Sequence, residues 1–116
     1  MIEDWQALIG AMNGGVADLR KAAPEAMAGF SALAKAACAS GALDRKTKEL
    51  IALAIGVATR CQPCIAYHAQ GAASAGATRA EIAETLGMAV YMGAGPSAMY
   101  AAEALEAFDQ LAGSPR

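Results

Sequence analysis

The residues that could do chemistry in this chain are concentrated in one short stretch. Cys61 and Cys64 are separated by two residues, and His68 lies four positions after the second cysteine. His68 is the only histidine of the chain, and Cys38 is the only other cysteine. A C-x-x-C pair at the start of a helix can cycle between dithiol and disulfide, because free backbone N–H groups and the helix dipole stabilise a thiolate there. The spacing therefore predicts a redox-active dithiol site.

A helix is expected to begin at this cysteine pair. The segment 59–63 has the composition of a turn, and Pro63 suits the first position of a helix that runs to about Ala75. Cys64 and His68 then share one helix face, because side chains four apart lie one above the other. Cys61 lies just before the helix or at its start. Which cysteine attacks first stays open, since proximity to His68 favours Cys64 and the helix start favours Cys61.

Glu49 is the candidate acid of the site. It lies at the edge of an apolar run that extends from Leu50 to Ala58. If this segment and the helix that carries His68 pack as an antiparallel hairpin, Glu49 faces Gly71, one turn beyond the histidine. A glutamate there could orient the imidazole or accept its proton. We therefore expect a proton relay of Glu49 and His68 beside the two thiols.

Two other uses of the same residues are considered. Cys61, Cys64 and His68, joined by Cys38, would form a Cys3His zinc site in a non-catalytic, zinc-stabilised or regulatory oligomer. A c-type haem would need a histidine directly after the second cysteine, and Ile65 occupies that place. No cofactor is therefore expected, and the zinc set is the alternative. Taken alone, Cys38 is expected to be a small buried residue.

The segments that must hold this site are all predicted to be helices. A first helix is marked by an apolar stripe at steps of three and four, with a kink predicted at Asn13–Gly15. A second begins at Pro24 and ends at Ser40–Gly41. Asp44 caps a third, which is apolar on nearly every side from Leu50 onwards and is therefore expected to be central. The stripe of the first helix consists of Ile2, Trp5, Ile9, Met12, Val16 and Leu19.

The C-terminal half continues this pattern. Thr78 and Glu81 form a T-x-x-E capping box that starts a fifth helix, and Gly93–Pro96 separates it from a last one. No alternating pattern of strands is present. The sequence predicts an all-α bundle of about six helices, in a single domain that covers 1–116.

Composition limits the partners and the compartment. Hydrophobic residues make up 56% of the chain but aromatic ones only 5%, which suggests that apolar surface is also buried between subunits. A net charge of -2 without a basic patch argues against nucleic acid. The longest uncharged runs contain glycine and polar residues, so no membrane span is expected. The acidic start lacks the features of a signal peptide, and a cytoplasmic protein is expected.

With these residues in view, the chain resembles the carboxymuconolactone decarboxylase-like superfamily, and within it the alkylhydroperoxidase D-like branch. The match is strongest over L-D-R-K-T-K-E-L-I-A-L-A-I and R-C-Q-P-C-I-A-Y-H-A-Q-G-A, within 42–95. The family pattern places a glutamate twelve residues before a C-x-x-C whose second cysteine lies four before a histidine. Glu49, Cys61, Cys64 and His68 meet this pattern.

The resemblance implies an all-helical subunit that assembles as a homo-trimer or homo-hexamer. It implies peroxide reduction or dithiol–disulfide exchange, with Cys61 and Cys64 cycling and with Glu49 and His68 as the proton relay. The substrate would be a hydroperoxide, and an external dithiol (a lipoyl group, a thioredoxin-like protein or similar) would reduce the pair. One departure is Pro63, where the best-known peroxidases carry a second histidine. Decarboxylases of the superfamily generally lack the cysteine pair, which makes lactone decarboxylation the less favoured inheritance.

Overall fold

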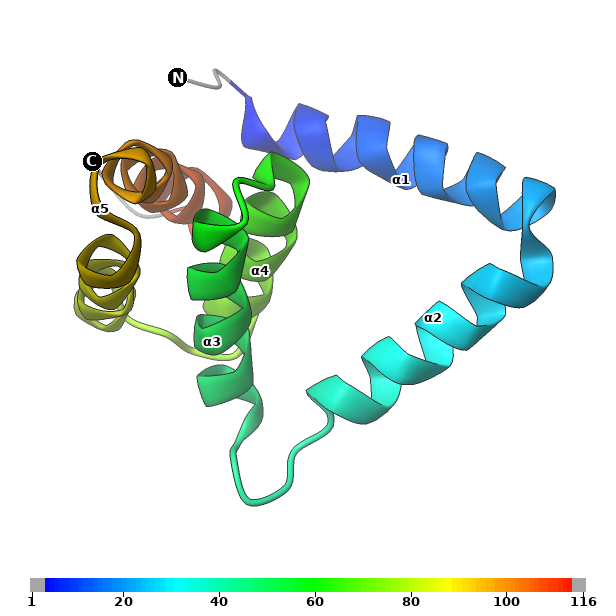
Figure 1. Ribbon diagram of the computed structural model, residues 1–116, viewed down its shortest axis with the longest axis horizontal. Coiled ribbons are helices and arrows are strands. Elements are labelled where there is room, and N and C mark those ends of the chain that lie inside the picture. The colour runs from blue at the N-terminus through cyan, green and yellow to red at the C-terminus, as the bar shows by residue number, and fades with distance from the viewer. Residues whose placement is uncertain (1–3, 114–116) are drawn as a thin grey trace.

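The computed structural model describes residues 4–113, and these residues form α-helices without any strand. In Figure 1, α3, α4 and α5 gather in one body, while α1 and α2 form an arm that projects from it. The five helices are α1 (Trp5–Ala22), α2 (Pro24–Cys38), α3 (Arg45–Ala58), α4 (Gln62–Ser74) and α5 (Arg79–Leu111).

The prediction of an all-α bundle is confirmed, and the number of helices differs by one for a local reason. The fifth and sixth predicted helices are a single element, α5, with a break at Ala94, where φ is 55° and ψ is -141°. Pro96 causes this break, because its ring cannot follow a regular helix and it offers no N–H. Helical turns continue on both sides, so the predicted boundary at 93–96 is a break within α5.

The first helix is continuous where a kink was predicted. α1 runs through Asn13–Gly15 without interruption, although each glycine costs about 1 kcal/mol relative to alanine. Its N-terminal end is held by Trp5, which is fully buried and whose indole Nε1 donates a hydrogen bond to Glu106 at 3.0 Å. Ile2, the first residue of the predicted stripe, lies outside the described residues.

The core lies between α3, α4 and α5. The largest fully buried side chains in this body are Leu53 and Val57 from α3, Ile65 from α4 and Ile82 from α5. Trp5 adds the N-terminal end of α1 to the same cluster. Small residues fill the rest of the interior, mostly alanines of α4 and α5. Because alanine side chains are short, the helices approach closely, and α4 is held between its neighbours.

None of the residues of the second helix, α2, is buried. Phe30 and Leu33 expose 61% and 63% of their surface. Cys38, expected to be buried, is an exposed free thiol at the end of α2. The physical reason is tertiary: α2 belongs to the arm that projects from the body (Figure 1), so the side of the helix that carries Phe30 and Leu33 stays exposed.

The third helix is central but is not buried on all sides. One face packs in the core and carries Glu49, Leu53, Gly56 and Val57. The opposite face leaves Ile51 and Ile55 about half exposed. An apolar sequence on every side therefore does not correspond to complete burial within this chain.

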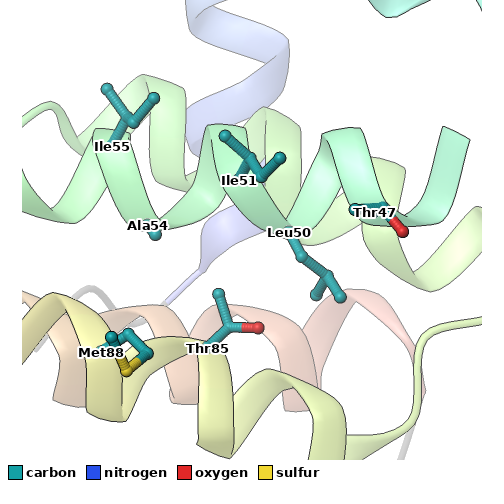
Figure 2. A pocket seen from close by; sticks show the side chains of 7 residues that line it. All are labelled: Thr47, Leu50, Ile51, Ala54, Ile55, Thr85 and Met88. Atoms are coloured by element: carbon teal, nitrogen blue, oxygen red, sulfur yellow. The ribbon is translucent and has the colours of Figure 1, made fainter. Parts of the chain in front are cut away.

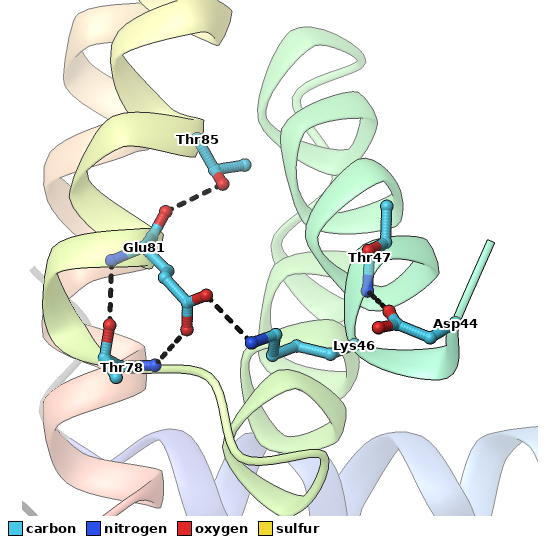
Figure 3. A network of polar contacts seen from close by, with 6 residues as sticks. All are labelled: Asp44, Lys46, Thr47, Thr78, Glu81 and Thr85. Atoms are coloured by element: carbon cyan, nitrogen blue, oxygen red, sulfur yellow. Dashed lines mark hydrogen bonds and ion pairs between the residues drawn. The ribbon is translucent and has the colours of Figure 1, made fainter.

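Charged residues connect the starts of α3 and α5, as Figure 3 shows. Lys46 Nζ lies 2.8 Å from Glu81 Oε2. The other carboxylate oxygen of Glu81 accepts from the backbone N–H of Thr78, while the Thr78 hydroxyl accepts from the Glu81 N–H. This arrangement confirms the predicted capping box. The hydrogen bond from Lys46 lowers the pKa of Glu81 below its ordinary value, and the bond from Thr78 adds to the effect.

Within residues 4–113, no helix is both long enough and apolar enough to cross a bilayer.

The lowered pKa of Glu81 predicts a pH-dependent contribution to stability. The carboxylate form stabilises the fold above the unfolded pKa of about 4.5, and this stabilisation disappears as the pH falls through the lower pKa of the folded state. Glu81→Gln keeps an oxygen for the capping box but loses the ion pair with Lys46. We expect the variant to lower the melting temperature at pH 7 more than at pH 3, measured by circular dichroism.

Asp18→Asn is the matched control, because Asp18 is exposed on α1 and forms no ion pair within residues 4–113. Equal destabilisation by Glu81→Gln at both pH values would contradict the assignment.

Candidate functional site

The turn between α3 and α4 sets the position of the cysteines. The Cys61 N–H donates to the Gly56 carbonyl at 3.0 Å and the Arg60 N–H to the Val57 carbonyl at 3.1 Å, the pattern of a Schellman motif. Arg60 therefore takes the left-handed position, with φ at 58°, where glycine is usual. This conformation costs a non-glycine residue roughly 1–2 kcal/mol. The motif ends α3 at Ala58, and α4 begins at Gln62, directly after Cys61.

Cys61 and Cys64 are joined by a disulfide at the start of α4. Their Cα atoms lie 5.2 Å apart, within the range that disulfides adopt. Cys61 is the N-cap of α4, and its sulfur accepts a hydrogen bond from the Cys64 N–H at 3.2 Å. In the reduced protein the same N–H would stabilise a thiolate at Cys61, because this backbone donor has no partner within the helix.

Glu49 and His68 form the second half of the site. The Glu49 Oε1 atom lies 3.4 Å from His68 Nδ1, and Glu49 is buried, with 7% of its surface exposed. His68 lies one turn after Cys64 on α4, and about a third of its side chain is exposed. The carboxylate lies against Gly71, as the hairpin register predicts: a Cβ atom added there would be 1.5 Å from Glu49 Oε2.

Two glycines allow the helices of this site to approach closely, and of these only Gly71 was named from the sequence, as the position that Glu49 faces. A Cβ atom on Gly56 would lie 3.3 Å from the Cβ of Cys64, so α3 passes close to the second cysteine. Gly71 leaves the space that the Glu49 carboxylate fills. Each glycine weakens its helix, and a glycine inside a helical pattern is the sequence signal for such a close approach.

A second carboxylate also reaches the cysteine motif. Gln62, between the two cysteines, donates from Nε2 to Oε1 of Glu103 on α5. Nothing in the sequence signals this contact, because 41 residues separate the two partners. Tyr67 lies against the core, and its hydroxyl donates to Asn13 Oδ1.

The zinc alternative does not assemble in this structure. Among residues 4–113, no three histidine, cysteine or carboxylate side chains are grouped closely enough to hold a metal ion. Cys38 is an exposed thiol on the arm, and the sulfurs of Cys61 and Cys64 are bonded to each other. The predicted Cys3His set is therefore not formed, because tertiary structure places Cys38 on a different element from the other three residues.

The arrangement as a whole can carry out a two-electron thiol reaction. A C-x-x-C pair stores two electrons as a dithiol and releases them on forming its disulfide. A buried carboxylate within reach of an imidazole can receive or return the proton that a reacting thiol loses. His68 lies one turn after Cys64 on α4, and the Glu49 carboxylate reaches His68 from α3.

A family model and a solved structure both relate this chain to one family. Residues 24–107 match the model of the carboxymuconolactone decarboxylase family. The chain is similar to the crystal structure of an apo carboxymuconolactone decarboxylase family protein from Legionella pneumophila, with 55% identity and a TM-score of 0.90, covering 93% of this chain and 96% of that one.

Two curated relatives are themselves named as uncharacterised. The protein from Cupriavidus necator is 40% identical over 96% of this chain and 98% of its own length. A protein of the cox locus of Paracoccus denitrificans is 42% identical over 73% of this chain and 77% of its own length.

Gly71→Ala tests how the carboxylate is positioned. The new methyl group would overlap Glu49 Oε2, so the carboxylate must move away, whereas alanine favours the helix by about 1 kcal/mol. We expect little loss of stability and a clear change in the ring resonances of His68, which nuclear magnetic resonance can follow because the chain has one histidine.

Gly10→Ala on α1 is the control, since nothing lies within 4 Å of a Cβ atom at that position. If Gly71→Ala left the His68 resonances as in Gly10→Ala, the close contact between Glu49 and α4 would be refuted.

Proposed function

Because this chain belongs to the carboxymuconolactone decarboxylase family, we propose that it is a thiol-dependent oxidoreductase of the alkylhydroperoxidase D-like kind. One observation carries the proposal. The C-x-x-C pair forms a disulfide at the start of α4, and His68, one turn after Cys64 on the same helix, lies 3.4 Å from the Glu49 carboxylate of α3. Cys61, Cys64, Glu49 and His68 are the proposed catalytic residues.

The oxidative half of the reaction uses a hydroperoxide. The Cys64 thiolate attacks the peroxide oxygen distal to the organic group, the O–O bond breaks, and the alkoxide leaves as an alcohol after taking up a proton. Cys64 is then a sulfenic acid. The Cys61 thiol attacks this sulfur, a disulfide forms, and water leaves. Two electrons have passed from the cysteine pair to the peroxide.

The reductive half uses an external dithiol, such as a lipoyl group or a thioredoxin-like protein. One thiolate of the reductant attacks the Cys61–Cys64 disulfide and forms a mixed disulfide. Its second thiol displaces the protein sulfur, so the reductant leaves oxidised and both cysteines regain their protons. Exchange between dithiols and disulfides without peroxide turnover uses the same steps and is the nearest variant of the proposed activity.

Glu49 and His68 supply the proton movements. His68 is one turn from Cys64 and about a third of its side chain is exposed, so it can take the thiol proton and return a proton to the departing alkoxide. Glu49, buried behind it, stabilises the imidazolium that forms when His68 takes this proton. Cys64 is the proposed attacking residue because of this neighbour, and Cys61, already in the N-cap position, resolves.

Subunit assembly and location complete the proposal. We expect a homo-trimer or homo-hexamer, because ten large apolar side chains of the described residues are exposed, several of them by more than half of their surface. A cytoplasmic setting fits the chemistry, since cellular dithiols there would return the pair to the reduced form.

Stoichiometric oxidation tests the proposed reaction. Reduced protein mixed with one equivalent of an alkyl hydroperoxide should lose two mass units per chain, and peptide mapping should join Cys61 to Cys64. Cys61→Ser should accumulate a sulfenic acid at Cys64, and Cys64→Ser should consume peroxide at the background rate. Sulfenic acid on Cys61 alone would reverse the two roles, and no disulfide in the wild-type chain would refute the reaction.

Glu49→Gln tests the relay. The variant keeps the shape of the side chain but cannot hold a negative charge next to His68, so proton transfer from Cys64 is disfavoured. We expect iodoacetamide to alkylate Cys64 roughly threefold to tenfold more slowly near neutral pH, measured by mass spectrometry of the reduced protein. The exposed Cys38 provides an internal reference in the same molecule. An unchanged ratio of the Cys64 rate to the Cys38 rate would remove Glu49 from the mechanism.

A further inference from the structure

An apolar groove lies on the side of α3 opposite the disulfide site. It runs between α3 and the first half of α5 and encloses about 390 Å³. Figure 2 shows Ile51 and Ile55 on one wall and Met88 and Thr85 on the other. The groove continues past Met88 to Ala58 and Met92. No charged residue lines either part.

The groove is not built for a polar ligand. Its two hydroxyl-bearing residues are Thr47 and Thr85. The Thr85 hydroxyl donates to the carbonyl of Glu81 within its own helix, at 2.8 Å, and the backbone N–H of Thr47 donates to Oδ1 of the N-cap Asp44 (Figure 3). The remaining surface consists of methyl and methylene groups. The complementary surface is therefore a set of apolar side chains.

The arm of the same protein carries such a set. Ala26, Phe30, Leu33 and Ala37 follow one another at steps of four, three and four along α2, which is the spacing of a coiled-coil seam. Each is exposed, and no charged residue interrupts the seam. A helix of 15 residues without any buried side chain gains little from packing within its own chain, so this face needs a partner.

The walls of the groove have the same spacing as the seam. On α3 the wall residues follow one another at steps of four, three and four: Thr47, Ile51, Ala54 and Ala58. On α5 they follow at steps of three and four: Thr85, Met88 and Met92. A seam that spans 12 residues, or 11 helical rises, extends about 16 Å in each helix. The small Ala54 and Ala58 leave room between Ile55, Met88 and Met92 for large side chains such as Phe30 and Leu33, as in knobs-into-holes packing.

We propose that α2 of one copy of this chain packs into the α3–α5 groove of a second copy. The arm cannot reach its own groove, because α2 and α5 lie on opposite sides of α3 (Figure 1). The contact is therefore made between molecules, and each chain contributes one arm and one groove.

The apolar area agrees with an interface between copies. Phe30 and Leu33 on the arm, and Ile51, Ile55, Met88 and Met92 in the groove, expose between 44% and 78% of their surface. Each thus contributes on the order of 100 Å², or roughly 600 Å² per chain, against about 800 Å² that each partner buries in a stable interface. The alanines of both seams supply much of the remainder.

Charge placed on either surface should separate the copies. Phe30→Glu on the arm and Met88→Glu in the groove would each bury an unpaired carboxylate. The dissociation constant of the assembly, measured by sedimentation with the disulfide intact, should rise at least tenfold, or about 1.4 kcal/mol. Ala28→Glu is the matched control, because Ala28 is exposed on the far side of α2. Circular dichroism verifies that each variant keeps its helices, as expected for positions that are exposed in the single chain.

Mixing the two variants distinguishes this contact from other interfaces between copies. The Phe30→Glu chain retains its groove and the Met88→Glu chain retains its arm, so a mixture should associate more tightly than either variant alone. A contact of arm with arm, or of groove with groove, would give no such gain and would overturn the proposal. A monomeric wild-type chain, or equal effects of Phe30→Glu and Ala28→Glu, would also overturn it and would leave the groove to a different partner. None of these outcomes depends on whether the cysteine pair reacts with peroxide.

Discussion

The close approach of α3 and α4 is the constraint on which the rest of this structure depends. Gly56 allows α3 to pass the second cysteine, and Gly71 opens the space in which a buried carboxylate lies against α4. Both glycines weaken their own helices. They allow the two helices to approach closely, because a longer side chain at either position would push apart Glu49, His68 and the disulfide-bonded cysteines.

The same hairpin presents two different surfaces on opposite faces of one helix. Towards α4, α3 presents Glu49 and the buried Leu53, and away from it the helix presents the exposed Ile51 and Ile55. A helix that is apolar all round would be enclosed within a larger protein. The helices within residues 4–113 leave the outer face of α3 exposed, so one face carries the proposed site and the other is available for association.

Local sequence determined much of the molecule. The helices, the capping box at Thr78, and the placement of Cys64 and His68 on one helix face depend on contacts between residues three or four apart, which spacing predicts. The register that brings Glu49 to Gly71 was also predictable, because the Thr59–Pro63 turn is short and leaves an antiparallel hairpin little freedom.

Tertiary structure alone decided the remainder. The exposure of Cys38, of Phe30 and of the outer face of α3 could not be inferred from the sequence. Exposure depends on which elements pack together, and α2 projects from the body. The contact of Gln62 with Glu103 joins residues far apart in the chain and leaves no pattern in it. The sequence by itself thus determined which residues form the proposed site and their local geometry, since both arise within two adjoining helices. Which surfaces were left open was decided by the fold, since exposure is a property of the whole arrangement.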